Sequence, residues 1–291
     1  MAFVTILTPT YNRASKLHIL YESLVSQSDK DFEWFIVDDG SEDDTGKIVN
    51  DWISESIINI KYIKKENGGK HTALNLGIAQ IFSEWTFIVD SDDYLTKDAI
   101  AIIKNKADVD DAEDICGLAF LRQSKNGNYL TNKLVPEDGW KDDFCHCRYG
   151  LKIKGDMAEV WKTKCLKEFP FPVFDGEKFC SEDVIWIKLA KYYKMRFYNT
   201  AIYLSDYLED GLTKTRRKMN YNSPKGVMNR GAVQLEASLP FMYKCRAMIY
   251  YQVYGKIAGY TNLELFKKTH HKSFFIIMFL VSRVAYRKLV K

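Results

Sequence analysis

The chain has 291 residues, of which 46% are hydrophobic and 14% aromatic, enough to bury the core of one large domain with or without an appendage. Its formal net charge of +4 is nearly balanced, so the composition gives no argument for a nucleic-acid partner. Six cysteines at irregular spacing are typical of reduced thiols in a cytosolic protein.

The N-terminal half shows strands that alternate with single helices. Residues 1–12 have neither a basic leader nor a long apolar segment with a cleavage site, so they predict a strand and not a signal peptide. The expected elements in chain order are strand 3–8, helix 15–26, strand 33–41, helix 45–53, strand 60–65, helix 71–82 and strand 85–89. This alternation predicts βαβ units and a mostly parallel sheet of the α/β class.

The pattern is weaker after residue 115. Residues 154–156 are expected to precede a helix, and Pro170 and Pro172 make their segment irregular. The remaining expected elements are strand 115–121, helix 181–193, strand 195–207 and helices at roughly 226–260 and 272–290. We place a domain boundary near residue 215, and the chain beyond Lys214 is basic.

The ends of three predicted strands are polar, and two of them are acidic. Their sequences are TPTYNR (8–13), VDDGSEDD (37–44) and VDSDD (89–93). Ligands of open α/β sheets bind beyond the carboxyl ends of the strands, so we expect these three segments to form one site.

The segment VDSDD is open to three interpretations. A calcium loop of the EF-hand type is excluded, because Leu95 and Ala101 stand where Gly and Glu are required. A haloacid-dehalogenase-type phosphatase would use Asp90 and Asp92, but Tyr94 replaces its Thr or Val. The third interpretation is a carboxylate pair that holds a divalent cation against a diphosphate, which would relieve the repulsion between the acids.

The other two strand ends favour a nucleotide. Tyr11 offers an aromatic face for a base, and Asp39 offers an acceptor for the imide N–H of uracil. In contrast, Cys145, His146 and Cys147 have no second ligand pair at zinc-finger spacing, and we interpret them as structural.

Five segments in this order resemble glycosyltransferase family 2, which consists of inverting enzymes of the GT-A fold. They are TILTPTYNR, FIVDDGSEDDT, NGGKHTALNLGI, WTFIVDSDDYL and SEDVIW, and the resemblance covers residues 3 to about 215. It implies a Rossmann-like nucleotide-diphosphate-sugar transferase fold over residues 1–215, followed by a C-terminal helical region over residues 216–291.

The resemblance also assigns residues to the donor. It implies that Pro9, Tyr11, Arg13 and Asp39 hold the nucleotide. The D-x-D signature of the family matches Asp90-Ser91-Asp92, with Asp93 adjacent. We expect Asp92 to be the main ligand of Mn²⁺ or Mg²⁺, with help from Asp93 and Asp90, and Asp90 with Ser91 to lie toward the nucleotide sugar.

For the catalytic base, the resemblance indicates the E-D pair of SEDVIW, with Asp183 as the base and Glu182 beside it. The residues agree with a site at a helix start. Ser181 can cap a helix there, and a carboxylate in the first turn faces the positive end of the helix dipole. Without the other motifs, a simple capped helix start would be the favoured explanation of Glu182 and Asp183.

Other segments carry weaker expectations. Lys70 and His71 at a Gly-rich helix start suit phosphates, although the segment does not match a P-loop. Lys214 and Arg216 belong either to a basic loop that closes over the diphosphate or to an ordinary solvated linker. Asp156 is a further candidate for contact with the donor sugar or the acceptor.

The C-terminal segment contains an apolar run at 274–281 between basic residues. The run is too short to span a membrane and suits either a helix in the membrane interface or a helix packed on its own domain. The resemblance favours the membrane interface, and it implies a cytoplasmic enzyme that is peripheral on the inner face of the plasma membrane. It also implies transfer of a sugar from a UDP-sugar to a glycan on a polyprenyl-diphosphate carrier, in the synthesis of a surface polysaccharide. The alternatives are a catalytically degenerate GT-A binding or assembly module and the phosphatase.

Overall fold

Strand β1 (Val4–Thr10) lies inside a mixed sheet, and all seven of its residues are buried. The computed structural model describes the backbone of residues 1–108, 112–205 and 212–290, and their side chains except those of 212–215 and 290. β1 pairs in parallel with β2 (Phe32–Asp38) and β4 (Trp85–Ile88), and β2 pairs in parallel with β3 (Ile60–Lys64). The predicted parallel βαβ units are confirmed, and the carboxyl ends of these strands meet at one edge.

The second half of the sheet extends β4 by strands of mixed direction. β8 (Met157–Lys162) is antiparallel to β4 and to β6 (Ile115–Gln123), and β6 is parallel to β9 (Lys194–Leu204). The short strands β5 (Tyr94–Leu95) and β7 (Trp140–Asp142) both pair with β9 in antiparallel orientation. β5 directly follows the acidic segment at 89–93, so the pairing of β5 with β9 connects this segment to β9.

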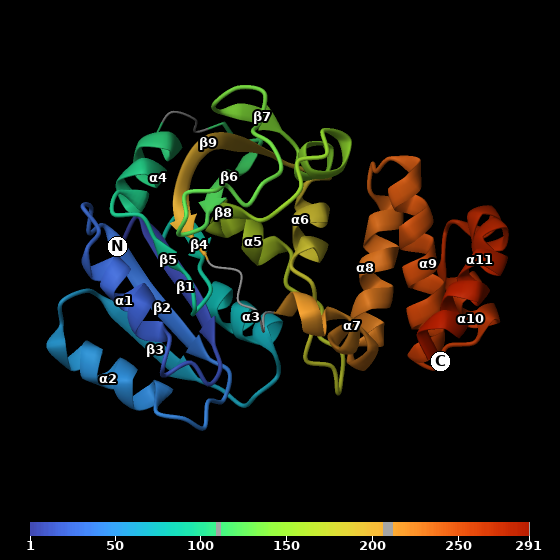
Figure 1. Ribbon diagram of the computed structural model, residues 1–291, viewed down its shortest axis with the longest axis horizontal. Helices are drawn as coiled ribbons and strands as arrows, with labels where there is room; N and C mark the ends of the chain where they lie inside the picture. The colour runs from blue at the N-terminus through green and yellow to red at the C-terminus, as the bar shows by residue number, and fades with distance from the viewer. Residues whose placement is uncertain (109–111, 206–211, 291) are drawn as a thin grey trace.

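Helices cover both faces of the sheet and enclose two cores (Figure 1). One face carries α1 (Leu17–Val25), α2 (Thr45–Glu55) and α4 (Ala99–Ala107). The other face carries α3 (Lys70–Gln80), α5 (Thr163–Glu168) and α6 (Asp183–Leu189), with Trp161 of the sheet stacked on Trp186 of α6 at 4.3 Å between ring centroids. This second face positions α3 and α6, whose N-termini enter the candidate site.

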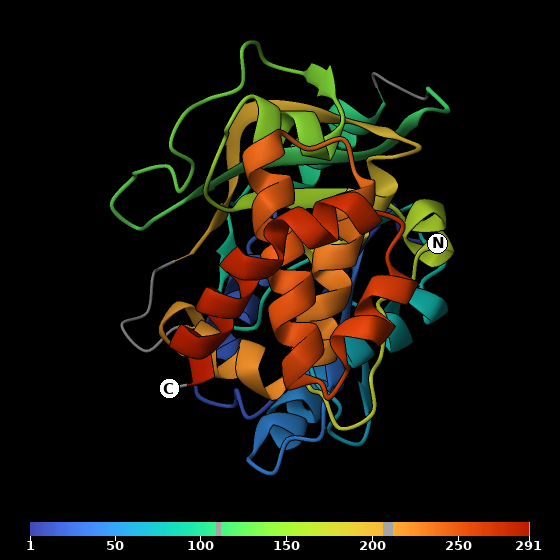
Figure 2. The same ribbon diagram turned by 90° about the vertical axis from the view of Figure 1, so that its right-hand side faces the viewer.

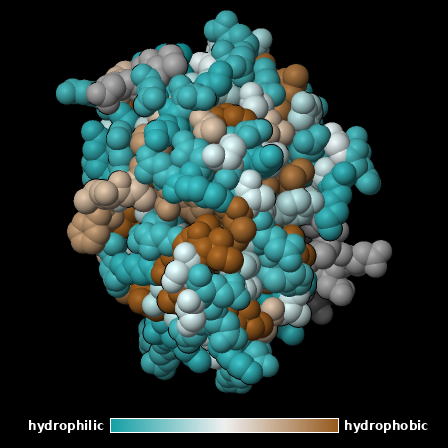
Figure 3. Space-filling view, turned by 90° about the vertical axis from the view of Figure 1, so that its left-hand side faces the viewer, coloured by the Kyte–Doolittle hydropathy of each residue, from teal (hydrophilic) through white to brown (hydrophobic). Residues whose placement is uncertain are grey.

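Beyond β9, the described part of the chain is helical. It contains α7 (Leu212–Asn222), α8 (Pro224–Glu236), α9 (Phe241–Ile257), α10 (Asn262–Lys268) and α11 (Lys272–Val290). α8 packs on α6, α9 on α8 and α11 on α9, so these helices extend the molecule in successive layers (Figures 1 and 2). The opposite face of the molecule is mostly hydrophilic, with separate apolar patches (Figure 3).

Three expectations about secondary structure are wrong. Lys214 and Arg216, expected in a loop or a linker, lie in helix α7. Residues 154–156 precede strand β8 and not a helix, because residues on both faces of this segment are buried between β4 and β6. The helix expected at 226–260 is two helices, α8 and α9, which are separated at residues 237–240. Pro240 restricts the residue before it and lacks an N–H donor, so the chain turns there and α9 starts afresh.

Candidate active site

The loops after β1 and β2 are held together by hydrogen bonds from backbone amides. Asn12 adopts a left-handed conformation with a φ of 51° and donates its N–H to Ser41 Oγ at 2.8 Å. Arg13 N–H donates to Thr45 Oγ1 at 3.1 Å. The turn leaves the side chain of Tyr11 46% exposed at the strand ends, next to the buried Pro9, which suits the predicted contact with a base.

Asp39 organises the segment that leads into α3. Its Oδ1 accepts from Lys65 Nζ at 2.7 Å and from Gly68 N at 2.9 Å, and its Oδ2 accepts from Gly69 N at 2.7 Å and Asn67 Nδ2 at 3.3 Å. With four donors on a carboxylate that is 3% exposed, Asp39 is primarily an anchor for residues 65–69. Its predicted bond to uracil stays a prediction and requires one of these donors to be displaced.

Gly69 brings this loop against the segment before α6. Its φ is +94°, and a Cβ atom at this position would lie 2.1 Å from the carbonyl oxygen of Lys178. Lys178 Nζ also donates to Asn67 Oδ1 at 2.6 Å. The N-termini of α3 and α6 are therefore held next to each other.

Lys70, the first residue of α3, joins two of the predicted acidic motifs. Its Nζ lies 2.5 Å from Asp90 Oδ1 and 2.6 Å from Glu182 Oε1. Burial lowers the pKa of Lys70, but the two carboxylates outweigh it and raise the pKa above its ordinary value. Lys70 is thus a cation that links the D-x-D segment to the E-D pair.

His71 lies behind this bridge. It is buried, and burial lowers the pKa of its imidazole, as does Lys65, while Asp39 opposes the shift. Its Nδ1 has no hydrogen-bond partner among the described residues. The predicted contact of His71 with phosphate stays a prediction.

Each carboxylate of the D-S-D-D segment lies within 4.0 Å of a basic group, and Asp90 and Asp93 share Arg122. Asp90 contacts Lys70, and Arg122 Nη1 lies 4.0 Å from its Oδ2; burial raises the pKa of Asp90, but these cations bring it below its ordinary value. Asp92 Oδ2 lies 3.6 Å from Arg13 Nη2. Lys70 and Arg13 thus offset the charges of Asp90 and Asp92, whereas burial and the neighbouring Asp90 raise the pKa of Asp93 to about 7 in spite of Arg122 and Tyr203.

Asp93 is held by Tyr203 and by Arg122, which it shares with Asp90. Its Oδ2 accepts a hydrogen bond from Tyr203 OH at 2.8 Å and lies 3.7 Å from Arg122 Nη1. The same tyrosine oxygen accepts from the backbone N–H of Asp90 at 3.0 Å, and Ser91 between them is buried. Asp93 and Tyr203 therefore fix the turn, and the predicted metal contact of Asp93 stays a prediction.

The acids fit a divalent cation only in one way. No group of three or more His, Cys, Asp or Glu side chains in the described ranges could hold a metal ion by itself. Mg²⁺ and similar ions commonly use one or two protein carboxylates and complete their shell with substrate phosphates. Asp92, whose side chain is partly exposed, and its neighbour Asp90 fit such a shared site.

Asp183 begins α6, beside Glu182. Ser181 Oγ donates to its Oδ1 at 2.6 Å, and Tyr149 OH donates to its Oδ2 at 3.4 Å. Arg230 of α8 donates through Nε to Oδ1 at 2.8 Å and to Oδ2 at 2.9 Å. All of these groups are donors, which suits an ionised carboxylate because it can only accept.

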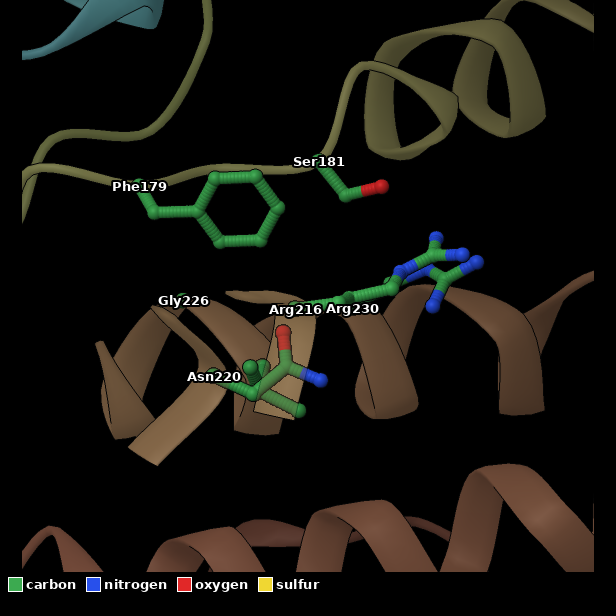
Figure 4. A pocket seen from close by; sticks show the side chains of 7 residues that line it. Phe179, Ser181, Arg216, Asn220, Gly226 and Arg230 are labelled. Carbon is green, nitrogen blue, oxygen red and sulfur yellow. The ribbon is translucent and has the colours of Figure 1, made fainter. Parts of the chain in front are cut away.

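Arg216 of α7 and Arg230 line a small pocket next to Ser181 (Figure 4). Both side chains lie across the pocket from Phe179 and Ser181 (Figure 4). Arg216 thus lies near Ser181, which precedes the E-D pair, and its predicted contact with the diphosphate stays a prediction. The side chain of Lys214 lies outside the described residues, and Asp156 is exposed on the turn before β8.

A larger cavity of about 600 Å³ lies toward the other end of α6. It is formed by α6, α8 and the segment between α10 and α11, and its basic lining residues are Lys188, Lys191, Lys268, His270 and His271. None of the residues at the acidic strand ends lines this cavity, so the cavity is separate from the site that those strand ends form.

The Glycosyl transferase family 2 model matches residues 5–165, more than half of the chain. The chain belongs to glycosyl transferase family 2. One curated relative, the GalNAc(5)-diNAcBac-PP-undecaprenol beta-1,3-glucosyltransferase of Campylobacter jejuni, is 24% identical over 268 residues, which are 89% of this chain and 84% of the relative. Other curated relatives are longer: the chain covers 15% of glycosyltransferase GlyA of Streptococcus pneumoniae, with 33% identity over 103 residues, 35% of this chain.

Solved structures confirm the predicted GT-A fold. The structure of S. aureus TarS 1-349 in complex with UDP-GlcNAc aligns with a TM-score of 0.66 and 20% identity, over 96% of this chain and 79% of that one. Mannosyltransferase PcManGT of Pyrobaculum calidifontis, in complex with GDP-Man and Mn²⁺, aligns with a TM-score of 0.58 and 14% identity, over 99% of this chain and 81% of that one. This family 2 chain therefore has its acids at the strand ends of a GT-A sheet.

Three site residues of this family 2 chain were not found from the sequence. Arg122, Tyr203 and Arg230 lie on β6, β9 and α8, and their partners are 29 to 113 residues away along the chain. None belongs to a local motif. The basic character of the C-terminal region was a general signal, but it did not single out Arg230.

Replacing Gly69 with Ala tests the contact between the α3 and α6 segments. A methyl group there meets the backbone of Lys178, whereas at Gly176, with a φ of +76°, a Cβ atom meets nothing within 4 Å. We expect Gly176→Ala to cost about 1–2 kcal/mol of unfolding free energy from its backbone conformation alone. Gly69→Ala should cost at least about 2 kcal/mol more in urea unfolding, because backbone must move as well. Equal losses would contradict the proposed packing.

Replacing Glu159 with Gln tests a half-buried carboxyl group that interacts with Arg122 and Glu182. Burial raises the pKa of this carboxyl on β8 to about 7, and Glu182 and Asp156 add to the rise, while Arg122 and Arg148 oppose it. The folded state therefore holds the proton more tightly than the unfolded state, so this group makes folding less stable as pH rises from its ordinary value toward about 7.

The stability of Glu159→Gln relative to wild type should increase by about 1–2 kcal/mol between about pH 5 and pH 8, measured by urea unfolding. The control is Glu84→Gln on the exposed turn before β4, which should show no such trend. A flat difference for Glu159→Gln would show that the carboxylate is already compensated by its arginine neighbours.

Proposed function

We propose that the chain is an inverting glycosyltransferase in which Asp183 is the catalytic base and the strand-end acids hold the donor. The observation that carries this proposal is the Lys70 bridge, because one ammonium group connects Asp90 of the donor motif with Glu182 beside the base. The base is thus next to the place where the donor sugar would lie.

In the proposed reaction, a hydroxyl of the acceptor attacks the anomeric carbon opposite the diphosphate. Asp183 accepts the hydroxyl proton, the bond between the anomeric carbon and the diphosphate oxygen breaks, and the nucleoside diphosphate leaves. A single displacement inverts the anomeric carbon and gives a β-linkage from an α-linked donor. Arg216 is proposed to stabilise the negative charge that develops on the diphosphate.

The proposed donor is a UDP-sugar. The alignment with S. aureus TarS in complex with UDP-GlcNAc supports this class, and Tyr11, Arg13 and Asp39 surround the corresponding strand ends. The proposed cation is Mn²⁺ or Mg²⁺, held by Asp92 and Asp90, and it would neutralise charge on the leaving diphosphate. The PcManGT structure with GDP-Man and Mn²⁺ supports a cation of this kind.

The proposed acceptor is a glycan on a polyprenyl-diphosphate carrier, as the name of the Campylobacter jejuni relative indicates for that enzyme.

We propose a catalytic domain at 1–215 and a helical region at 216–291 that attaches the enzyme to the inner face of the plasma membrane. No helix in the described ranges is long and apolar enough to cross a membrane. On α11, five apolar side chains are each at least 50% exposed: Ile276, Ile277, Leu280, Val281 and Val284. Its basic residues include Lys272, Arg283, Arg287 and Lys288, which suit anionic headgroups.

Asp183→Asn tests the base. The asparagine oxygen can still accept from Arg230, but the side chain cannot take up the proton, so transfer should fall by at least about 10²-fold. UDP affinity, measured by calorimetry with Mn²⁺ present, should stay within about threefold of wild type because the strand ends are intact. Transfer at the wild-type rate would show that the base is another residue. Failure of wild type to bind UDP would favour a catalytically degenerate module.

The double variant Ile277→Asp/Leu280→Asp tests the membrane surface. Both side chains are 71% exposed, so the variant should fold, and its binding to sedimented phosphatidylglycerol vesicles should fall by about tenfold. Val173→Asp, at a position that is 59% exposed in the loop before α6, is the matched control and should bind as wild type. Equal vesicle binding by the double variant and wild type would show that α11 does not face the membrane.

A further inference from the structure

Arg230 makes a contact with Asp183 that is more extensive than the proposed function requires. Besides the two bonds from Nε, its Nη2 lies 2.5 Å from Asp183 Oδ2, so one guanidinium binds both oxygens of the carboxylate. The two side chains are only 17% and 16% exposed. Pairs of this geometry are stronger and more strictly oriented than exposed ion pairs.

The pair connects two parts of the molecule. Asp183 starts α6, which packs on the sheet, whereas Arg230 lies in the middle of α8, in the helical region after β9.

The position of α8 is fixed on both sides. Glu177 accepts from the backbone N–H groups of Lys225 and Gly226 at 2.8 Å each, and a Cβ atom at Gly231 would meet the backbone oxygen of Ala247 of α9 at 2.7 Å. Arg230 is therefore presented to the carboxylate from a rigid support.

The donors around Asp183 differ in how easily they can be replaced. Arg230 is anchored through α8, but Ser181 donates through a hydroxyl group that can rotate away from Oδ1. Tyr149 OH contacts Oδ2 only at 3.4 Å. An acceptor hydroxyl can therefore reach the carboxylate by taking the place of Ser181 or Tyr149 while Arg230 stays bound.

We propose that Arg230 is the positioning residue of the base: its guanidinium fixes the plane of the Asp183 carboxylate, and the acceptor hydroxyl replaces the weaker donors. This inference rests on the proposed role of Asp183. It makes the C-terminal helices part of the catalytic machinery, because the base is oriented correctly only when α8 is docked on α6. The neighbouring Arg216 is left for the diphosphate.

Arg230→Ala and Arg230→Lys test this role, with UDP release measured from the UDP-sugar and the polyprenyl-diphosphate-linked glycan that wild type uses. Arg230→Ala should lower kcat by about 10²-fold, because a misplaced reacting group costs that much, while KM for the donor stays within about threefold. Arg230→Lys retains the positive charge but lacks the planar guanidinium donors that bind both carboxylate oxygens, so its kcat should fall at least about tenfold. Guanidinium chloride at millimolar concentration should restore part of the activity of Arg230→Ala.

Arg246→Ala is the matched control, because this exposed arginine of α9 donates to Tyr250 OH and lies over the Tyr250 ring, away from the acidic strand ends. It should have wild-type kcat and show no guanidinium effect. If Arg230→Ala does not fold, Arg230→Lys decides the question, and wild-type kcat in that variant overturns the inference. The same holds for wild-type kcat in a folded Arg230→Ala, or for a loss that guanidinium does not reduce.

These outcomes separate the inference from the proposed function. Asp183→Asn without effect on transfer means that the base itself is misassigned. If Asp183→Asn abolishes transfer and Arg230→Lys behaves as wild type, the base is correct and only the role of Arg230 is wrong.

Discussion

The ammonium group of Lys70 lies between Asp90 and Glu182, and the geometry of the whole site depends on this contact. Two carboxylates about 4 Å apart repel by about 4 kcal/mol at an effective dielectric of 20, so they need a cation between them. Lys70 is placed by Asp39, whose oxygens hold residues 65–69, and by Gly69, which packs on Lys178. The buried Asp39 after β2 thus helps to position the lysine that links the D-x-D segment to the E-D pair.

The same compensation recurs around the site. Arg13 faces Asp92, Arg122 faces Asp93, and Arg230 faces Asp183, and each cation comes from a different element than its acid. The contacts therefore connect the loop after β1, the β6 strand and the helix α8 to the acidic motifs. In the proposed function, a diphosphate with its cation would exchange for some of these contacts with Arg13 and Lys70.

The extent to which the sequence predicts this structure depends on the range of the interactions. The parallel half of the sheet follows from local apolar periodicity, and the acids after β2 and β4 could be placed because parallel strands end at one edge. β8 was misjudged, because the burial of its two faces depends on pairing with β4 and β6. Arg230 could not be found, because its contact with Asp183 depends on how α8 docks on α6 and not on any motif.

The central claim is that the acidic strand ends, and not the basic cavity at the far end of α6, receive the nucleotide sugar. A crystal structure with UDP and Mn²⁺ tests it most directly. We predict the uracil next to Tyr11 and the diphosphate between Arg13, Asp92 and Lys70, with the Asp183 carboxylate facing the open position of the sugar. UDP bound in the cavity lined by Lys188, Lys191 and Lys268, with the strand ends unchanged, would contradict the account.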